Sequence, residues 1–326
     1  MQLNRPRRNR RSPSVRSMVA ETVLTTHDLL APLFVVEGHN QRIPIQSMPG
    51  QFRLSIDQLV LEAKEIYSLG IPSIALFPAI EAGLKNSKAT EAINPDGLYP
   101  RALRAVKEAV PGLTLMTDIA LDPYNSDGHD GLVDPKSGEI LNDQTLEILS
   151  QMAVLQAECG AEIVGPSDMM DGRVEAIRKA LESNGHHHTL IMSYCAKYAS
   201  SFYGPFRDAL DSAPKAGDKK TYQMNPANVR EALREAQLDE QEGADILMVK
   251  PGLPYLDVIK TLRENTHLPI AAYNVSGEYA MIKAAAEKGW LDGDRAMMEM
   301  LLSFKRAGTD IILTYFAKEA AKILNS

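Results

Sequence analysis

The sequence has little cysteine and no long apolar segment. Its two cysteines, Cys159 and Cys195, are too few for a disulfide-stapled scaffold or for a zinc site built from four cysteines. No apolar run approaches the roughly 18 residues that a membrane-spanning helix needs. The first residues lack the apolar core of a secretory signal peptide, so we expect a cytoplasmic protein without a membrane partner.

Charge is unevenly distributed along the 326 residues. Residues 1–16 contain six arginines and no acidic residue, a local charge of +6. Because the whole chain carries −7, the remaining residues carry −13. Such an acidic body argues against a general nucleic-acid-binding surface. The arginine-rich segment is a solvated tail, an arm that binds nucleic acid, or an arm that docks on an acidic neighbouring subunit, and the acidic body favours the third interpretation.

Short apolar runs alternate with amphipathic stretches after this segment. The runs predict eight buried strands, at residues 32–36, 73–78, 113–120, 162–167, 189–197, 246–251, 269–275 and 310–316. Apolar residues three or four positions apart predict helices at 56–69, 100–110, 143–159, 174–183, 226–242, 256–265, 279–288 and 294–307. Several of these helices end at a glycine, as helix C-termini often do.

Eight strands that alternate with helices predict a parallel sheet, because parallel neighbours need helical crossovers. Eight such units fit a single closed (β/α)₈ barrel of the TIM type. The alternative is an open doubly wound sheet, but the first strand-to-helix turn, residues 37–52, has no Gly-x-Gly-x-x-Gly. No phosphate-binding Gly-x₄-Gly-Lys-Ser/Thr occurs either. We therefore expect an extended basic arm over residues 1–25 and a barrel over residues 26–326.

Two lysines stand at the ends of neighbouring predicted strands, Lys197 on the fifth and Lys250 on the sixth. Reactive groups of such barrels lie where strands end, and adjacent strands are about 4.8 Å apart. Two ammonium groups in one pocket would lower each other's pKa, and burial would act in the same direction. Strict alternation also predicts that Ser193, Cys195 and Lys197 share one face of the fifth strand.

An uncharged buried amine can attack a carbonyl and form a Schiff base. One such lysine indicates a class I aldolase, whereas two indicate that two carbonyl substrates are held together. The alternative for either lysine is that it snorkels to solvent or pairs with an aspartate.

Longer motifs carry a family resemblance. They occur at residues 118–131 (DIALDPYNSDGHDG), 193–209 (SYCAKYASSFYGPFRDA), 222–228 (YQMNPAN), 243–252 (GADILMVKPG) and 271–281 (AAYNVSGEYAM). In these motifs the chain resembles 5-aminolevulinate dehydratase, also called porphobilinogen synthase, over essentially its whole length. The resemblance implies a lyase that joins two molecules of 5-aminolevulinate into porphobilinogen, with loss of two waters, in tetrapyrrole biosynthesis.

The resemblance also implies roles for individual residues. Lys250 would form the Schiff base with the first substrate, and Lys197 would hold the second, also as a Schiff base. The implied carboxylate-binding residues are Arg207 and Lys219 for the second substrate and Ser276 and Tyr315 for the first. From the residues alone, Ser276 would be a turn residue and Tyr315 a core tyrosine.

Residues 198–225 form a connection longer than the roughly 12–15 residues of an inert loop. It carries Phe202, Tyr203 and Phe206 as well as both anion-binding candidates. We expect an active-site lid, because closure would exclude water from the imine. The alternative is a disordered insertion, against which the aromatic residues argue.

The chain departs from the zinc-dependent members of that family. Where these hold zinc with three cysteines, it has Ala120, Asp122 and Asp130. Carboxylates match magnesium better than a thiolate-type zinc site, so we expect no catalytic zinc. We favour a catalytic role for Asp118 and substrate-binding roles for Asp122 and Asp130, although ion binding remains an alternative. For Asp127 we favour loop solvation.

The resemblance implies two further features. Glu235 matches the protein ligand of an allosteric magnesium ion, although by itself it would be one charge on a solvated helix face. The resemblance implies assembly through the arm, so we expect a homo-oligomer, specifically an octamer, and no nucleic-acid partner. The competing functions are a class I aldolase and a nucleic-acid-binding scaffold that uses the arginine-rich arm.

Overall fold

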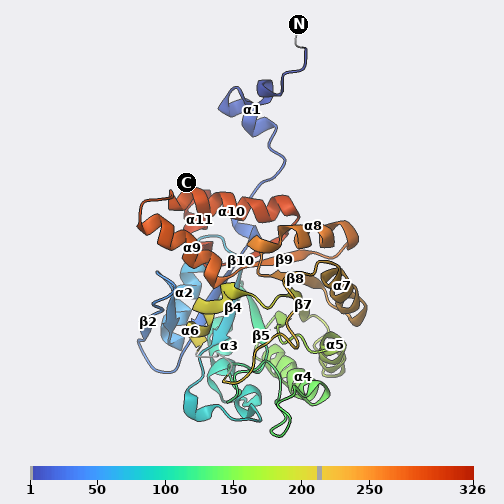
Figure 1. The fold of residues 1–326 in the computed structure, drawn as a ribbon. Coiled ribbons are helices and arrows are strands. Elements are labelled where there is room, and N and C mark those ends of the chain that lie inside the picture. The colour runs from blue at the N-terminus through green and yellow to red at the C-terminus, as the bar shows by residue number, and fades with distance from the viewer. Residues whose placement is uncertain (1–2, 211–214) are drawn as a thin grey trace.

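The computed structural model describes residues 3–210 and 215–326. Residues 1–2 of the expected arm and 211–214 of the expected lid lie outside the described residues. Eight parallel strands close into a barrel, because β10 pairs with β1 in parallel, with Leu29 opposite Ile312 (Figure 1). The barrel strands are β1 (Leu29–Val35), β4 (Ser73–Pro78), β5 (Thr114–Ile119), β6 (Ile163–Pro166), β7 (Leu190–Lys197), β8 (Ile246–Lys250), β9 (Ile270–Asn274) and β10 (Ile311–Thr314). Each coincides with a predicted apolar run, so the barrel prediction is confirmed.

Helices connect these strands and cover the barrel. They are α2 (Ile56–Ser68), α3 (Leu98–Ala109), α4 (Asn142–Glu158), α5 (Arg173–Ser183), α6 (Gly204–Leu210), α7 (Arg230–Glu242), α8 (Leu256–Asn265), α9 (Ser276–Glu287), α10 (Gly293–Ala307) and α11 (Ala317–Leu324). Among the described α-helices, α6, α11 and the short α1 (Pro13–Met18) were not predicted. None of the described helices has the length and apolar character that crossing a bilayer requires.

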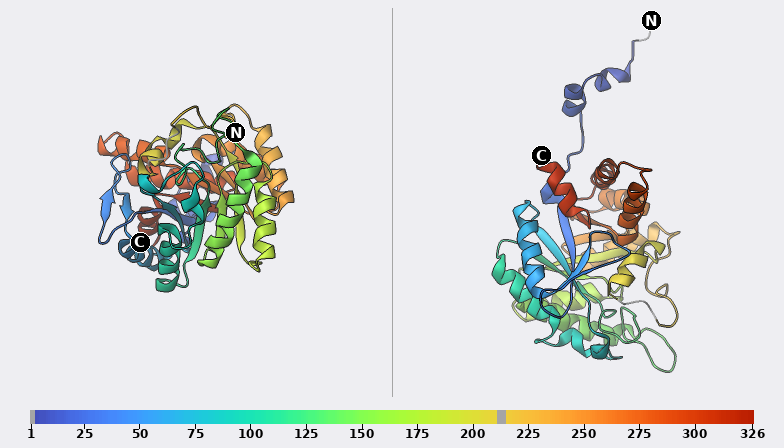
Figure 2. Two further views of the ribbon diagram at one scale, coloured as in Figure 1. Left: turned by 90° about the horizontal axis from the view of Figure 1, so that it is seen from below. Right: turned by 90° about the vertical axis from the view of Figure 1, so that its left-hand side faces the viewer.

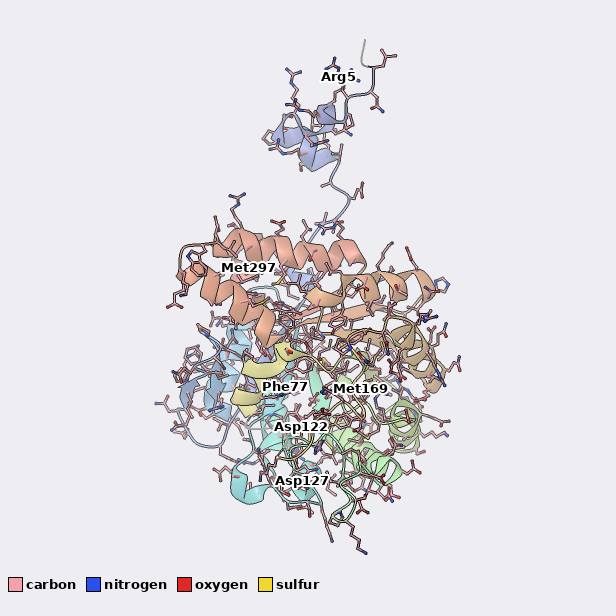
Figure 3. All side chains as sticks on the ribbon, in the orientation of Figure 1. Arg5, Phe77, Asp122, Asp127, Met169 and Met297 are labelled. Atoms are coloured by element: carbon pink, nitrogen blue, oxygen red, sulfur yellow. The ribbon has the colours of Figure 1, made fainter. Side chains whose placement is uncertain are left out.

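Helix α10 illustrates how the sequence specifies these elements. Asp292 caps its start by accepting a hydrogen bond from the Arg295 amide at 3.1 Å. Its buried residues recur at helical spacing, from Met297 through Met300 and Leu301 to Phe304 (Figure 3). The helix ends at Gly308, whose φ of 117° lies in the left-handed region that favours glycine. The apolar stripe therefore fixes which face packs on the barrel.

A short hairpin was not predicted from the sequence. Strand β2 (Arg42–Pro44) pairs antiparallel with β3 (Phe52–Leu54), and β3 pairs in parallel with β1. Each strand is only three residues long and β2 is exposed, so neither carries the apolar run that marks the barrel strands. The hairpin lies outside the barrel, beside β1.

Strand β7 contains an irregularity that changes which residues face the barrel interior. Ser193 lies opposite Leu247, but Ala196 lies opposite Val249, so β7 has one extra residue between these pairs. The prediction that Ser193, Cys195 and Lys197 share one face is therefore wrong. The Ser193 hydroxyl contacts Asp239 of α7 and Arg173 of α5 on the helical side of the strand. This β-bulge brings Lys197 directly opposite Lys250.

The N-terminal segment projects away from the barrel on the side of α10 and α11 (Figures 1 and 2). It contains a 3₁₀ turn (Pro6–Arg10) and the short helix α1 (Pro13–Met18). Arg5 lies near its far end, whereas Phe77 and Asp122 lie in the barrel body (Figure 3). The apolar side chains of Leu3, Met18 and Val23 are 78%, 84% and 68% exposed. An arm with exposed apolar side chains and six arginines has the composition of a contact segment.

Candidate active site

Lys197 and Lys250 are the last residues of β7 and β8 and lie opposite each other in the sheet. Each is only 6% exposed, so neither side chain snorkels to solvent. Both line one pocket at the carboxyl end of the barrel, together with Asp122, Tyr203, Phe206, Arg207, Lys219 and Gln223. The strand-end argument from the sequence thus brings these two amines to one site.

The Lys250 amine lies among aromatic rings. Its Nζ is 4.5 Å from the ring centre of Tyr273, 5.0 Å from that of Phe206 and 5.1 Å from that of Tyr194. Within residues 3–210 and 215–326, no hydrogen bond or ion pair to this nitrogen is found. Burial, and then the nearby charge of Lys197, lower the pKa of Lys250 to about 7. A substantial fraction of this amine is therefore uncharged at neutral pH.

Lys197 has different surroundings. Its Nζ lies 3.0 Å from Asp130 Oδ2 and also donates to the Ser167 carbonyl oxygen. The other oxygen of Asp130 accepts from Lys219 Nζ at 2.6 Å, and Lys219 also contacts Asp122 Oδ2 at 3.3 Å. The sequence argument treated both amines as uncharged, whereas Lys197 lies in an ion pair. The barrel mouth therefore holds one amine with a lowered pKa beside one amine that is ion-paired.

Asp130 is the anion between two cations. Burial alone would raise its pKa, but the charges of Lys197 and Lys219 outweigh burial and hold the pKa of Asp130 below its usual range. For Lys219, burial lowers the pKa, but the charges of Asp122 and Asp130 outweigh burial and raise it above its usual value. Both shifts favour the charged forms of Asp130 and Lys219.

Asp118 lies near the end of β5 and interacts electrostatically with Asp122 and with both strand-end lysines. Burial and the charge of Asp122 raise the pKa of Asp118 to about 6, and the charges of Lys250 and Lys197 oppose that shift. Its Oδ1 is buried and has no hydrogen-bond partner among the described residues. A carboxyl group with a pKa close to neutrality and a free oxygen can exchange a proton with a reacting molecule.

The segment after β7 covers this pocket. It forms a 3₁₀ turn (Ser201–Tyr203) and α6, which packs on α9. The Tyr203 hydroxyl donates to the Lys250 carbonyl oxygen at 3.1 Å, and Phe206 meets Phe77 edge to face at 5.3 Å. Arg207 and Lys219 line the same pocket, as expected for anion-binding residues.

Ser276 and Tyr315 lie beside the pocket but have protein partners. The Ser276 hydroxyl accepts from the Phe206 amide at 3.0 Å and contacts the Phe202 carbonyl oxygen at 3.4 Å. The Tyr315 hydroxyl lies 2.9 Å from that of Tyr273. Both side chains are buried, and in this structure Ser276 joins the covering segment to the start of α9.

Sequence reasoning missed Gln223, Tyr194 and Tyr273. Gln223 lines the pocket and is 5% exposed. The only available signal was its place inside the motif at residues 222–228. Tyr194 lies in the middle of β7 and Tyr273 lies one residue before the end of β9, so only Tyr273 carried the strand-end signal of a pocket wall.

The three positions that the resemblance matches to zinc-binding cysteines carry no thiol in this chain. Ala120 has no ligand atom, and Asp122 and Asp130 are ion-paired with lysines. Across residues 3–210 and 215–326, no cluster of three or more histidine, cysteine, aspartate or glutamate side chains is arranged to hold a metal ion. Hard, ammonium-paired carboxylates do not suit the soft coordination of a thiolate zinc site.

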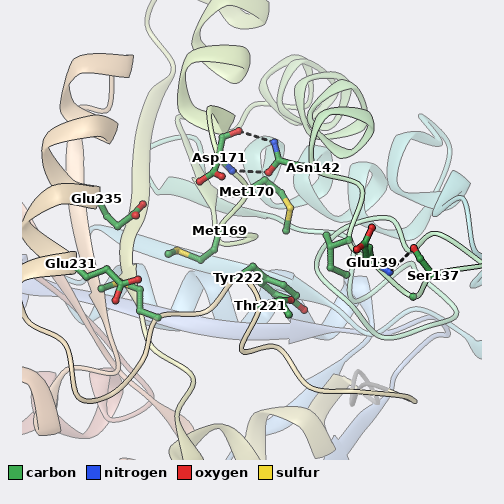
Figure 4. A pocket seen from close by; sticks show the side chains of 13 residues that line it. Ser137, Glu139, Asn142, Met169, Met170, Asp171, Thr221, Tyr222, Glu231 and Glu235 are labelled. Atoms are coloured by element: carbon green, nitrogen blue, oxygen red, sulfur yellow. Dashed lines mark hydrogen bonds between the residues drawn. The ribbon is translucent and has the colours of Figure 1, made fainter.

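Glu235 lies away from the two lysines, in a second pocket of about 560 Å³. Figure 4 shows Glu231 and Glu235 extending from α7 toward this pocket, with Asp171 and Met169 on the facing side. Burial raises the pKa of Glu235; Arg173 opposes the shift, and Asp239, Asp171 and Glu231 add to it. Within the described part of the chain, no hydrogen bond to the Glu235 carboxylate is found. A half-buried carboxylate among other acids suits a hydrated divalent cation.

Comparison with known proteins decides the family. The family model for delta-aminolevulinic acid dehydratase matches residues 3–323. The chain belongs to this family. A chloroplastic delta-aminolevulinic acid dehydratase of Physcomitrium patens is 58% identical over 321 residues, covering 98% of this chain and 74% of the relative. The enzyme of Bradyrhizobium diazoefficiens is 56% identical over 323 residues, covering 99% and 91%.

A solved structure agrees over the whole fold. The Toxoplasma gondii delta-aminolevulinic acid dehydratase, crystallised with its reaction product porphobilinogen, has a TM-score of 0.97 and 56% identity, covering 99% of this chain and 92% of that one. As a member of the dehydratase family, this chain is a lyase of tetrapyrrole biosynthesis. The aldolase and nucleic-acid-binding alternatives are not favoured.

Proposed function

We propose that this chain condenses two molecules of 5-aminolevulinate into porphobilinogen and two waters, through imines on its two strand-end lysines. The observation that carries the proposal is the pair Lys197 and Lys250, opposite each other, buried, and differing in charge environment. Two amines in one pocket can hold two ketones within reach of each other, which one amine cannot do.

Lys250 reacts first in this proposal. Because the pKa of Lys250 is lowered, part of its amine is uncharged, and this form attacks the ketone carbon of the first substrate. A C=N bond replaces the C=O bond, the amine gives up its two hydrogens, and the carbonyl oxygen leaves as water. The carbon–carbon and carbon–nitrogen bonds that later join the two substrates displace the lysine nitrogens, which leave as free amines. Ser276 and Tyr315 would bind the carboxylate of this substrate after their present hydroxyl contacts are exchanged.

Lys197 must lose a proton before it can attack the second ketone. Asp130 already accepts its hydrogen bond, so this carboxylate is positioned to hold or relay that proton. Arg207 and Lys219 would bind the second carboxylate, and Asp122 and Asp130 would accept hydrogen bonds from the substrate ammonium. Asp118, with its free buried oxygen, is suited to take the proton that is lost in the final aromatisation.

Residues 198–225 act as a lid in this proposal. The pocket around the lysines has a free volume of about 30 Å³, whereas small-molecule sites typically measure roughly 300–1,000 Å³. Substrates therefore need the covering segment to move. A Cβ on Gly277 would lie 2.6 Å from the Phe202 carbonyl oxygen, so the glycine lets the segment approach α9 closely. Closure would then exclude water from the imines.

The residues around Glu235 suit magnesium. This carboxylate would be the protein ligand, with water completing the coordination shell. When bound, the ion would add positive charge to the acidic pocket of Glu235, Glu231 and Asp171, away from the lysines. We propose an allosteric effect on that basis, and no catalytic zinc.

Two properties of the intact protein complete the proposal. The exposed basic arm and the acidic remainder of the chain are complementary, so we propose that the arm docks on a neighbouring copy within a homo-octamer. We also propose a cytoplasmic location, although several plant relatives are named as chloroplastic.

The test is borohydride reduction in the presence of 5-aminolevulinate, followed by peptide mapping and mass spectrometry of the product. We expect reduced adducts on Lys250 and Lys197 and formation of porphobilinogen without borohydride. An adduct on one lysine, without any pyrrole product, would match an aldolase and overturn the proposal.

A further inference from the structure

The carboxyl ends of β8, β9 and β10 share a buried hydrogen-bond network centred on Glu278. This glutamate is the third residue of α9 and is fully buried. Its Oε1 accepts from the Leu253 amide at 3.0 Å, in the loop after β8. Its Oε2 accepts from Asn274 Nδ2 at 2.6 Å, at the end of β9, and from the Val275 amide at 3.1 Å. One side chain therefore joins the loops that follow two neighbouring strands.

The network extends to the third strand through Asn274. The Thr314 hydroxyl donates to Asn274 Oδ1 at 2.8 Å and accepts from the Phe316 amide at 3.1 Å. These two contacts flank Tyr315. Ser276 lies two residues before Glu278, and Lys250 lies three residues before Leu253. Each residue assigned to the first substrate is thus within three positions of a group in the network.

Ordinary helix capping accounts for only part of this arrangement. A glutamate at the third helical position commonly accepts from the amide that precedes the helix, as Glu278 does from Val275. The bonds to Leu253 and to the Asn274 side chain reach outside α9 and are not needed to start a helix. Moreover, burial raises the pKa of Glu278 to about 8, and its hydrogen-bond donors oppose that shift. A capping residue on the surface would avoid this unfavourable burial.

We propose that Glu278 is a positioning residue that fixes Lys250, Ser276 and Tyr315 relative to one another for the first substrate. This inference rests on the proposed function. It predicts a selective defect, because the described contacts of Lys197 are with Asp130 and Ser167 rather than with the Glu278 network. Loss of the network should therefore impair imine formation at Lys250 more than at Lys197.

The experiment measures borohydride trapping of 5-aminolevulinate at each lysine in the full chain, per folded molecule. In E278Q, one amide NH₂ must face an N–H donor, so at least one link breaks. E278D keeps a carboxyl group but shortens its reach. We expect trapping at Lys250 to fall about tenfold or more, within the hundredfold that a misplacement of roughly 1 Å can cause. Trapping at Lys197 should change less than about threefold.

The matched control is E62Q. Glu62 is also a buried carboxylate, but it lies on α2 and pairs with Arg42 and Lys318. We expect both lysines of E62Q to be trapped as in the wild type, per folded molecule. Equal losses at the two lysines in E278Q and E278D, or no loss at either, would overturn the positioning role. Absence of adducts in the wild type would instead overturn the imine function itself, and the inference with it.

Discussion

The hydroxyl of Tyr203 donates a hydrogen bond to the backbone carbonyl oxygen of Lys250 at 3.1 Å. The same carbonyl also accepts the Tyr198 amide at 2.9 Å. The covering segment is thus hydrogen-bonded to the strand that presents the reactive amine. The ring centre of Tyr203 lies 5.5 Å from the Lys250 Nζ. Closure of the segment and desolvation of Lys250 are consequently linked through one side chain.

We expect Y203F to weaken this link while leaving the ring in place. Loss of a single hydrogen bond of this kind typically costs about 0.5–1.5 kcal/mol, so kcat/KM should fall by roughly threefold to tenfold. Steady-state kinetics and a thermal melt would measure the effect. Y255F is the control, because Tyr255 stacks on Tyr198 through its ring. An unchanged kcat/KM in Y203F would show that the hydroxyl has no part in closure.

The pH dependence of imine formation should reflect the Lys250 amine. Its pKa of about 7 means that the uncharged form increases as the pH rises through 7. Adduct formation at Lys250 should therefore rise over that range and then level off. Because the charge of Lys197 contributes to the lowering, K197Q should move the rise to higher pH. The surface variant K260Q should leave the profile in place, and an unmoved profile in K197Q would contradict this explanation.

Removal of the Asp130 charge should destabilise the protein. D130N would remove the carboxylate that the buried amines of Lys197 and Lys219 share, and breaking a buried pair in this way typically costs about 3–5 kcal/mol. Urea unfolding would measure the loss, and D127N in the same loop should change stability by less than about 0.5 kcal/mol.

The buried charge of Asp130 also predicts that the stability of the folded protein falls in acid. Because the pKa of Asp130 is lower in the folded chain than the value of about 3.9 in an unfolded one, its stabilisation is complete above that value and is lost as the pH falls below it. The wild type should therefore lose more stability than D130N on acidification. A parallel loss in both proteins would argue against the pairing.

Magnesium should stimulate activity through Glu235. We expect activity to survive a zinc-selective chelator, to increase with added magnesium, and to lose that increase in E235Q. E240Q, on the same helix, should respond as the wild type does. Full inhibition by the chelator that only zinc reverses would overturn both the magnesium assignment and the interpretation of the aspartate loop.

Deletion of residues 1–16 should reduce the size of the assembly. The deletion removes all six arginines of the arm but none of the barrel elements. Light scattering on the intact and shortened chains would compare their masses, and we expect smaller oligomers from the shortened one. An unchanged mass would show that the arm does not hold the copies together.

The barrel and most of the site could be predicted from the sequence because each rests on local signals. Buried parallel strands are short apolar runs, and lysine at the end of such a run is unusual enough to mark chemistry. The hairpin β2–β3 carries no such signal, since its strands are three residues long. The ion pair of Lys197 with Asp130 and the contacts of Glu278 join residues far apart in the sequence, so only the fold could reveal them.

The bulge in β7 has a consequence for protein engineering. An ideal, uninterrupted strand of the same sequence would turn its final amine toward the surrounding helices. Anyone who transplants this two-amine chemistry onto a regular designed barrel must therefore copy the strand defect along with the lysines.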